Sequence, residues 1–394
     1  MSRLAPRTPL TRRLLATIAL GATAASVLVQ CDAGPVAAPP SPPVAPRADS
    51  QTSSAPPVTR TDPATACDRV VKGMTVRQQL AQLVVVGVDA TDARDAMKVV
   101  SGEQVGGIFL GGNKTGLLEG GALDGVQRAA RIPVSVAIDE EGGRVQRLDD
   151  LDGSIPSARQ MAATMSPRQV RDLAEKRGKA MRARGVTVDY APDADVTEQA
   201  DDEIVGDRSF SADPEKVRSY ALEFAAGLRA AGVMPVLKHF PGHGHGTGDS
   251  HKGAVQTPPL DQLRKLDLLP YRDIGEYGET GVMVGHLDVP GLTGGQPASL
   301  SAPAYKLLRE DYGFTGPALT DDLGAMKAIT AEYSLPVAVL KALQAGADEA
   351  LWSSGGRLDE VLDRLQQAFA SGELPAARVR DALERVLTSK QACK

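Results

Sequence analysis

Short apolar runs alternate with longer amphipathic stretches from residue 67 to residue 394. Eight of these runs have the length of strands, and they cover residues 83–88, 105–111, 134–139, 186–192, 235–240, 281–286, 316–322 and 347–352. Most are apolar at consecutive positions, which is typical of parallel strands buried on both faces. Eight strands alternating with helices predict an α/β fold, a single (β/α)8 TIM barrel, with a doubly wound open sheet as the alternative.

The stretches between the runs carry helix start signals. Three starts can be read directly, each with a capping residue and a glutamine or proline after it: Thr75 with Gln78, Ser166 with Pro167 and Gln169, and Asp213 with Pro214. Such pairs satisfy the free amides of a first helical turn. Gly232 is expected to end the third helix.

Polar residues follow the apolar runs at the same relative place. They are Asp139, the segment after Val188, Lys238 with His239, His286, and Asp321. In a barrel the carboxyl ends of all the strands meet at one mouth, so these side chains would converge there. This placement favours the barrel over the open sheet.

The first 31 residues have the features of a secretory signal. Four arginines and no acidic residue precede an apolar run over 14–29, and Cys31 follows it. We expect Cys31 to be a lipid-attachment site, although Gln30 is unusual before such a cysteine, so plain secretion stays open. Removing the segment takes away four of 44 basic and none of 49 acidic residues, so the formal charge falls from −5 to −9. Nucleic acid is therefore not an expected partner.

Residues 32–66 are predicted to be a disordered, proline-rich linker. Nine of the 27 prolines fall in these 35 residues, with almost no large apolar side chain. The folded domain is expected over 67–394, with Cys67 and Cys393 close to its ends. In an exported protein this pair can form a disulfide, and two free thiols are the alternative.

The stretch from Lys238 to Gly253, KHFPGHGHGTGDSHKG, holds four of the five histidines. The spacing of His243 and His245 is compatible with a metal site, and structural histidines are a third reading. The five glycines and one proline of this stretch indicate a loop after the fifth strand, which favours a catalytic loop without a metal or other cofactor.

Together with other blocks, this stretch carries a family resemblance. KHFPGHG followed by DSH resembles the motif of bacterial β-N-acetylglucosaminidases of glycoside hydrolase family 3. Further matching blocks are AIDEEGGRVQR (137–147), GDRSF (206–210), LREDYGFTGPALTDDLGAM (308–326) and RVLTSK (385–390). The resemblance covers roughly residues 70 to 390 and implies the type that consists of one barrel.

The resemblance assigns roles to individual residues. Asp321 matches the nucleophile, His251 the acid/base, and Asp249 the carboxylate that orients the imidazole. An imidazole can give and take back a proton near neutral pH, which a retaining glycosidase requires. Asp322 is expected to point away from the mouth, because side chains alternate along a strand.

The remaining matched residues imply a sugar site. Those expected to bind N-acetylglucosamine hydroxyls are Asp139, Arg147, Arg208, Lys238 and His239. Arg147 has a second reading as an ion-pair partner on the barrel rim. His243 is expected to shape the loop. His245 and the acidic segment 193–210 depart from the family pattern.

The expected function is a retaining exo-β-N-acetylglucosaminidase that acts on peptidoglycan fragments through a covalent glycosyl–aspartate intermediate. The chain is expected to be exported, to touch the membrane only through a lipid anchor, and to be monomeric. A phosphorylase or another family 3 β-glycosidase is the first alternative. A non-catalytic sugar-binding lipoprotein and a zinc-dependent barrel hydrolase are the others.

Overall fold

The computed structural model describes residues 63–393. The predicted signal segment, Cys31 and most of the predicted linker lie outside the described residues. The first described helix, α1 (Pro63–Lys72), begins four residues before the predicted domain boundary at Cys67. Its first residue is a proline, whose fixed φ angle suits the start of a helix.

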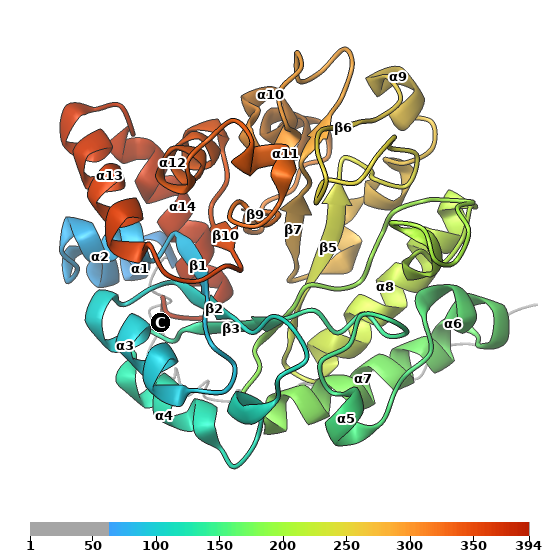
Figure 1. Cartoon of the computed structure of the whole chain (residues 1–394), viewed down its shortest axis with the longest axis horizontal. Coiled ribbons are helices and arrows are strands. Elements are labelled where there is room, and N and C mark those ends of the chain that lie inside the picture. Colours follow the sequence, from blue (N-terminus) through green and yellow to red (C-terminus); the bar gives the residue numbers. More distant parts are fainter. Residues whose placement is uncertain (1–62, 394) are drawn as a thin grey trace, which may run out of the picture. The chain divides into compact units, whose positions relative to one another are not determined.

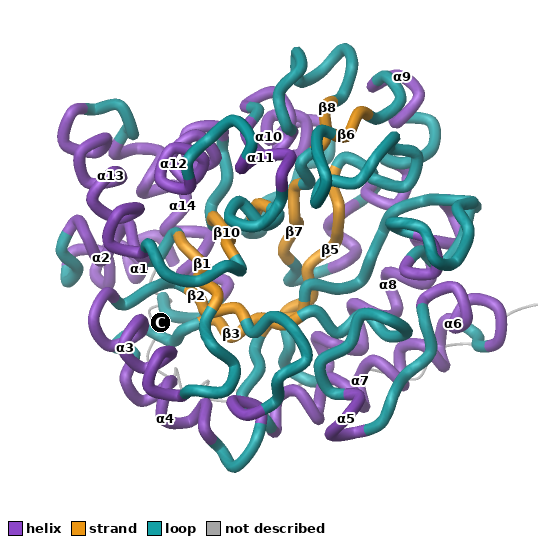
Figure 2. Tube along the Cα trace, in the orientation of Figure 1, coloured by secondary structure: helices purple, strands orange, loops and turns teal. Residues whose placement is uncertain are grey.

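Eight parallel strands form a barrel, as the sequence predicts. They are β1 (Val84–Gly87), β2 (Gly107–Phe109), β3 (Ser135–Ile138), β4 (Val188–Asp189), β5 (Met234–Phe240), β7 (Gly281–Val284), β9 (Ala318–Thr320) and β10 (Ala350–Trp352). The order is β10-β1-β2-β3-β4-β5-β7-β9, and a parallel bridge between Leu319 and Glu349 joins β9 to β10. Because both edges of the sheet meet, the open-sheet alternative is wrong. Figures 1 and 2 show the strands around the centre with helices outside them.

The helices surround the barrel and connect its strands. They are α2 (Val76–Ala81), α3 (Ala93–Glu103), α4 (Ala122–Ala129), α5 (Asp149–Asp152), α6 (Ala158–Thr164), α7 (Pro167–Ala183), α8 (Pro214–Ala230), α9 (Leu260–Leu263), α10 (Ala302–Lys306), α11 (Lys327–Thr330), α12 (Leu335–Ala345), α13 (Leu358–Ser371) and α14 (Ala376–Ser389). The three predicted starts are confirmed, at α2, α7 and α8. Gly232 follows α8 with φ +77°, a left-handed conformation that glycine adopts without strain. Within residues 63–393, no helix is long and apolar enough to span a bilayer.

A second, two-stranded sheet was not predicted. β6 (Val255–Gln256) pairs in parallel with β8 (Leu287–Asp288), which joins the loops after β5 and β7. Each strand is two residues long, too short for a hydrophobic period to reveal it. This pairing anchors the far end of the histidine-rich loop.

The barrel interior explains why the polar residues reach the mouth. Its buried side chains are Val85, Phe109, Ala137, Val188, Tyr190, Val236, Met283, Leu319 and Leu351. Residues two apart on a strand point to the same face. Three inward-facing residues are thus followed by polar ones: Ala137 by Asp139, Val236 by Lys238, and Leu319 by Asp321.

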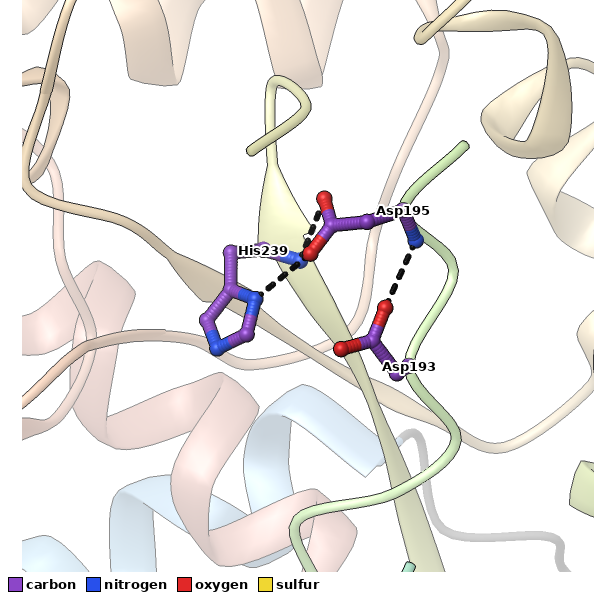
Figure 3. A group of neighbouring side chains, drawn as sticks. All are labelled: Asp193, Asp195 and His239. Atoms are coloured by element: carbon purple, nitrogen blue, oxygen red, sulfur yellow. Dashed lines mark hydrogen bonds and ion pairs between the residues drawn. The ribbon is translucent and has the colours of Figure 1, made fainter. Parts of the chain in front are cut away.

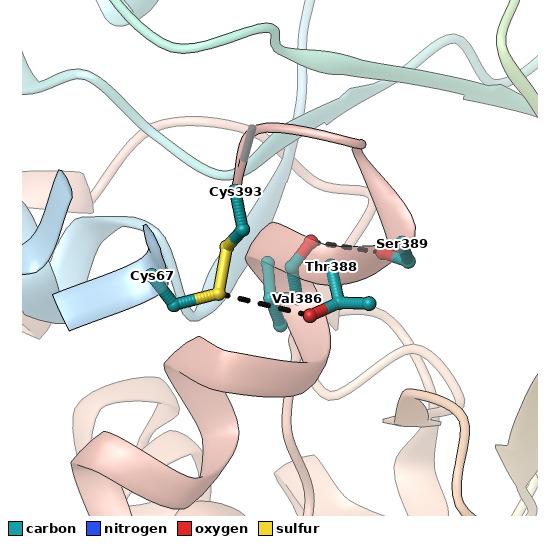
Figure 4. The surroundings of a disulfide bond; sticks show 5 residues. All are labelled: Cys67, Val386, Thr388, Ser389 and Cys393. Atoms are coloured by element: carbon teal, nitrogen blue, oxygen red, sulfur yellow. Dashed lines mark hydrogen bonds between the residues drawn. A yellow bond between two sulfur atoms is a disulfide. The ribbon is translucent and has the colours of Figure 1, made fainter. Parts of the chain in front are cut away.

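A disulfide joins the two ends of the described domain. Cys67 in α1 is bonded to Cys393, which follows α14, with their Cα atoms 4.6 Å apart (Figure 4). The hydroxyl of Thr388 lies 3.8 Å from the Cys67 sulfur. The bond closes a loop of 326 residues, so it ties the first and last helices of the barrel together.

Candidate active site

Lys238 forms the centre of the mouth. It lies on β5, and its side chain is only 3% exposed. Its Nζ is 2.8 Å from Asp139 and 2.5 Å from Glu141, both of which follow β3. Burial alone would lower the pKa of Lys238, but these two carboxylates offset it and raise the pKa, so the side chain stays charged.

Two arginines extend this charge network. Arg208 makes a two-pronged contact with Glu141, at 2.7 and 2.8 Å, and lies 3.7 Å from Asp193. Arg147 lies 3.5 Å from Asp139, at the looser end of the network. Arg147 therefore makes the ion pair that was its second reading. Its partner in this pair, Asp139, is itself one of the residues expected to bind the sugar.

His239 is held by a buried carboxylate. Its Nδ1 lies 2.8 Å from Asp195 Oδ2 (Figure 3). The amide of His243 donates to Asp195 Oδ1 at 2.6 Å. Burial would raise the pKa of Asp195, but the charges and hydrogen bonds of the two histidines lower it to about 2. Asp195 therefore fixes the ring of His239, whose Nε2 remains available to a ligand.

His243 lies beside this pair. Its ring is edge-on to that of His239, with centroids 5.7 Å apart, and it is buried. Burial lowers the pKa of His243, although the nearby charge of Asp195 acts to raise it. Its role in shaping the loop stays a prediction.

Asp193, Asp195 and His239 offer three ligand atoms within 4.8 Å of one another. A metal would have to displace the imidazole from Asp195, and the Arg208 guanidinium already lies 3.7 Å from Asp193 Oδ2. Asp193 Oδ1 accepts from the Asp195 amide at 2.8 Å, and burial next to Asp195 raises its pKa. The donors suit the orientation of His239, and they do not fit a divalent ion.

Asp321 follows β9 and faces the mouth. Its Oδ1 accepts from the amide of Asp322 at 2.8 Å, and no hydrogen bond within residues 63–393 reaches its Oδ2. Burial acts to raise its pKa, but the nearby His286, His239 and Lys238 offset this and hold the pKa below the usual range. Asp321 is thus an ionised carboxylate with one free oxygen.

Asp322 is turned to a different task. Its Oδ1 accepts from the amides of Gly324, Ala325 and Ser353 at 2.8, 3.2 and 3.1 Å, and its Oδ2 accepts from the Ser353 hydroxyl. These bonds fix the turn after β9 against β10. The predicted direction of Asp322, away from the mouth, is compatible with these bonds.

His286 is hydrogen-bonded to the same turn. Its Nε2 lies 2.9 Å from the carbonyl oxygen of Asp322, and its Nδ1 lies 2.7 Å from the hydroxyl of Ser299. Burial lowers the pKa of His286, although the nearby charge of Asp321 acts to raise it. Its polar position after β7 therefore serves to place Asp321 and Asp322.

Asp249 and His251 lie on the loop between β5 and β6. His251 Nδ1 is 3.0 Å from Asp249 Oδ1, and the imidazole is 66% exposed. The carbonyl oxygen of Ser250 between them accepts from the amide of Ala328, at 3.0 Å. The dyad is thus tied to the segment that follows Asp321, and the Nε2 of His251 is left open to solvent.

Two hollows lie at opposite ends of the barrel. The larger, about 1130 Å³, opens at the amino ends of the strands, where Ser135, Met234 and Pro317 line it, away from the site. The smaller, about 540 Å³, lies beside Asp249, between residues 199–204 and 246–254. Only the smaller one adjoins the proton-transfer dyad.

Sequence reasoning missed three residues of this site. Glu141 holds both Lys238 and Arg208, and Asp195 holds His239, with Asp193 beside it. Glu141 lies in the matching block AIDEEGGRVQR, and the signal that could have revealed it is a further acidic residue shortly after a strand. Asp193 and Asp195 lay in the segment noted only for its excess of acid.

The chain resembles known proteins along most of its length. Residues 75–389 match the family described as "Glycosyl hydrolase family 3 N terminal domain". The sequence is 48% identical over 383 residues to beta-hexosaminidase LpqI of Mycobacterium tuberculosis, covering 95% of this chain and 97% of that protein. A solved glycosyl hydrolase of the GH3 family from Mycobacterium smegmatis is 51% identical with a TM-score of 0.78, over 84% of this chain and 98% of that one. A family 3 β-N-acetylglucosaminidase from Paenibacillus sp. FPU-7 is 30% identical with a TM-score of 0.76, over 81% and 63%.

Proposed function

This chain belongs to glycosyl hydrolase family 3 and is a β-N-acetylhexosaminidase, and we propose that it removes terminal β-linked N-acetylglucosamine from peptidoglycan fragments with retention of configuration. In this proposal Asp321 forms a covalent glycosyl intermediate, and His251 moves the proton. Asp249 orients the imidazole of His251 and stabilises its charge.

The observation that carries the proposal is the contrast between Asp321 and His251. Asp321 is buried, ionised and has a free Oδ2, which suits attack on an anomeric carbon. The His251 ring is exposed, and only its Nδ1 is bound to a carboxylate, which leaves Nε2 to serve the leaving oxygen. A retaining glycosidase needs one nucleophile and one group that first gives and then takes a proton.

The proposed reaction has two chemical steps. Asp321 Oδ2 bonds to the anomeric carbon while His251 Nε2–H gives its proton to the departing glycosidic oxygen. The neutral Nε2 then takes a proton from a water molecule, whose oxygen attacks the same carbon and releases Asp321. An imidazole avoids placing a further negative charge beside the nucleophile.

The sugar is proposed to lie among the charged groups of the mouth. Lys238 and Arg208 offer donors for its hydroxyls, and Asp139 offers an acceptor beside them. His239, fixed by Asp195, offers its Nε2, and Arg147 contributes from the edge. Each of these groups is held by a neighbour before substrate arrives, which reduces the ordering cost of binding.

Export and lipid attachment at Cys31 remain part of the proposal, since a cell-envelope location would bring the enzyme to its substrate. Phosphate in place of water is the second candidate acceptor, because a histidine acid/base does not repel an incoming anion as a carboxylate would.

Product analysis tests the reaction. Purified muropeptides that begin with N-acetylglucosamine are incubated with and without phosphate, and the first-formed sugar is followed by proton NMR. Hydrolysis with retention gives β-N-acetylglucosamine in both conditions. A glycosyl phosphate identifies the phosphorylase, and first-formed α-N-acetylglucosamine contradicts the covalent intermediate.

A further inference from the structure

We propose that His245 is a positioning residue for proton transfer: its charged ring clamps the loop that carries Asp249 and His251 to the opposite rim and so shapes the pocket for the leaving group. This proposal rests on the proposed role of His251 as the acid/base. His245 contacts neither the sugar-binding residues nor the nucleophile, so its effect passes through the loop.

The geometry of His245 is that of a bridge. Its Nδ1 lies 2.8 Å from Asp267 Oδ1, and its Nε2 lies 3.2 Å from Glu198 Oε2. Asp267 is almost completely buried, at 2% exposed, whereas the Glu198 side chain is 76% exposed. The His245 ring can donate to both carboxylates at once only when both of its nitrogens carry a proton, because a neutral imidazole has one N–H.

The base of the loop is already seated on the opposite segment. The hydroxyl of Thr197 donates to the carbonyl oxygen of Gly244 at 2.8 Å, and a Cβ at Gly244 would lie 1.9 Å from the Val196 oxygen. His245 follows at the point where the loop leaves this contact. Residues Thr247 and Gly248 beyond it are exposed, so His245 is the last side chain that ties the loop to residues 196–199.

The pocket beside the dyad makes this bond relevant to catalysis. The hollow is lined by Gln199, the neighbour of Glu198, by Gly246, the neighbour of His245, and by Asp249. The contact between His245 and Glu198 therefore joins the two segments, 199–204 and 246–254, that line the hollow. A leaving group protonated by His251 would occupy this hollow, because it is the one next to Asp249.

The pH response follows from the groups that face the ring. These are Asp267 on one side and Glu198 on the other, and Asp195 adds a negative charge behind Asp267. The hydrogen bond to Asp267, with Glu198, raises the pKa of His245 despite partial burial. The clamp is thus complete while the ring is charged and is lost as the pH rises through the raised pKa. On the acid side it is lost when Asp267, whose pKa burial raises, takes up a proton.

The test compares pH profiles of kcat/KM for a natural disaccharide and for a dinitrophenyl glycoside, whose leaving group needs no proton. With the disaccharide, the wild-type profile should fall on the alkaline side more steeply than one ionisation allows, because His245 and His251 both lose protons. His245→Gln should be slower by about 10- to 100-fold at its optimum and fall with a single ionisation. The dinitrophenyl glycoside should be cleaved at nearly the wild-type kcat/KM.

Further variants separate charge from packing. His245→Lys keeps a cation between the two carboxylates and should restore most of the activity while removing the steep part of the profile. Glu198→Gln should move the alkaline limb to lower pH by a few tenths of a pH unit, the size expected of an exposed ion pair. Asp202→Asn removes an exposed acid from the same segment without touching His245 and should leave the profile unchanged.

The outcomes are distinct. An equal loss with both substrates in His245→Gln, or a profile as steep as that of the wild type, overturns the proposal. Failure of the proposed acid/base would show separately, as an equal loss with both substrates in His251→Ala. In that case the His245 variants would still report whether the clamp controls the loop.

Discussion

Replacing His251 with alanine separates proton transfer from nucleophilic attack. The ring is 66% exposed, and among the described residues 63–393 it is bonded only to Asp249 on its own loop. Its removal should therefore change the free energy of unfolding by no more than about 0.5 kcal/mol, as is usual at exposed positions. The variant can then be compared with the wild type as a folded enzyme.

The magnitude follows from the leaving group. Positioned proton donors typically contribute about 10²- to 10⁴-fold to the rate. The exposure of His251 lets water reach the same place, so we expect the lower half of that range with a natural disaccharide. A dinitrophenolate leaves without a proton, so formation of the glycosyl–Asp321 intermediate should keep its rate and its hydrolysis should become the slow step.

The assay follows both steps in one experiment. A burst of dinitrophenolate should precede slow turnover, and mass spectrometry of the quenched variant should show one added N-acetylglucosamine on the peptide with Asp321. Azide needs no base to attack, so it should speed turnover and give a β-glycosyl azide. Asp321→Ala should lose activity toward both substrates, and any azide product that it forms should be the inverted α-anomer.

The reasoning is refuted if His251→Ala slows the disaccharide and the dinitrophenyl glycoside by the same factor. The ring would then support the shape of the loop and would not carry the proton. An inverted azide product from His251→Ala would contradict the nucleophilic role of Asp321 instead. Thermal unfolding of both variants provides the control for folding.

Three further predictions concern support of the site. Asp195→Asn should raise KM more than it lowers kcat, reducing kcat/KM by about 10- to 100-fold through loss of a charged hydrogen bond to His239; a change in kcat alone would contradict this. Reducing the Cys67–Cys393 disulfide should lower the free energy of unfolding by about 2 to 4 kcal/mol, measured by urea unfolding. An unchanged free energy of unfolding would show that the disulfide does not stabilise the domain. Dialysis against EDTA should leave cleavage of a nitrophenyl N-acetylglucosaminide intact, whereas a loss restored by zinc would reinstate a metal at Asp193.

The barrel could be predicted because its signals are local. Each apolar run, helix cap and terminating glycine is defined by residues that are close in the sequence. Because side chains alternate along a strand, the inward-facing positions could also be followed to Asp139, Lys238 and Asp321 at the strand ends. The runs overestimated the strands, since the hydrogen-bonded part of the 186–192 run is only Val188–Asp189. Apolar residues continue past the paired backbone, since Tyr190 beyond this strand still packs in the barrel interior.

The partners of the site residues could not be predicted in the same way. The Lys238–Asp139 pair spans 99 residues, the Arg208–Glu141 pair 67, and the His239–Asp195 bond 44. The sequence shows which residues are charged, but which acidic residue pairs with which basic residue depends on the fold of the mouth. His245 illustrates this, because its departure from the family pattern was visible while its two carboxylate partners were not.

The charge pairing also explains how one carboxylate is kept reactive among many. Five neighbouring acids of the mouth each have a basic side chain against them: Asp139 and Glu141 have Lys238, Asp193 has Arg208, Asp195 has His239 and Asp249 has His251. Asp322 is saturated by amides and a hydroxyl. Within residues 63–393, Asp321 makes no ion pair, although the surrounding positive field keeps its pKa low. A nucleophile needs this combination, because a direct ion pair would block its free oxygen, whereas a field without contact favours the charge and leaves the oxygen open.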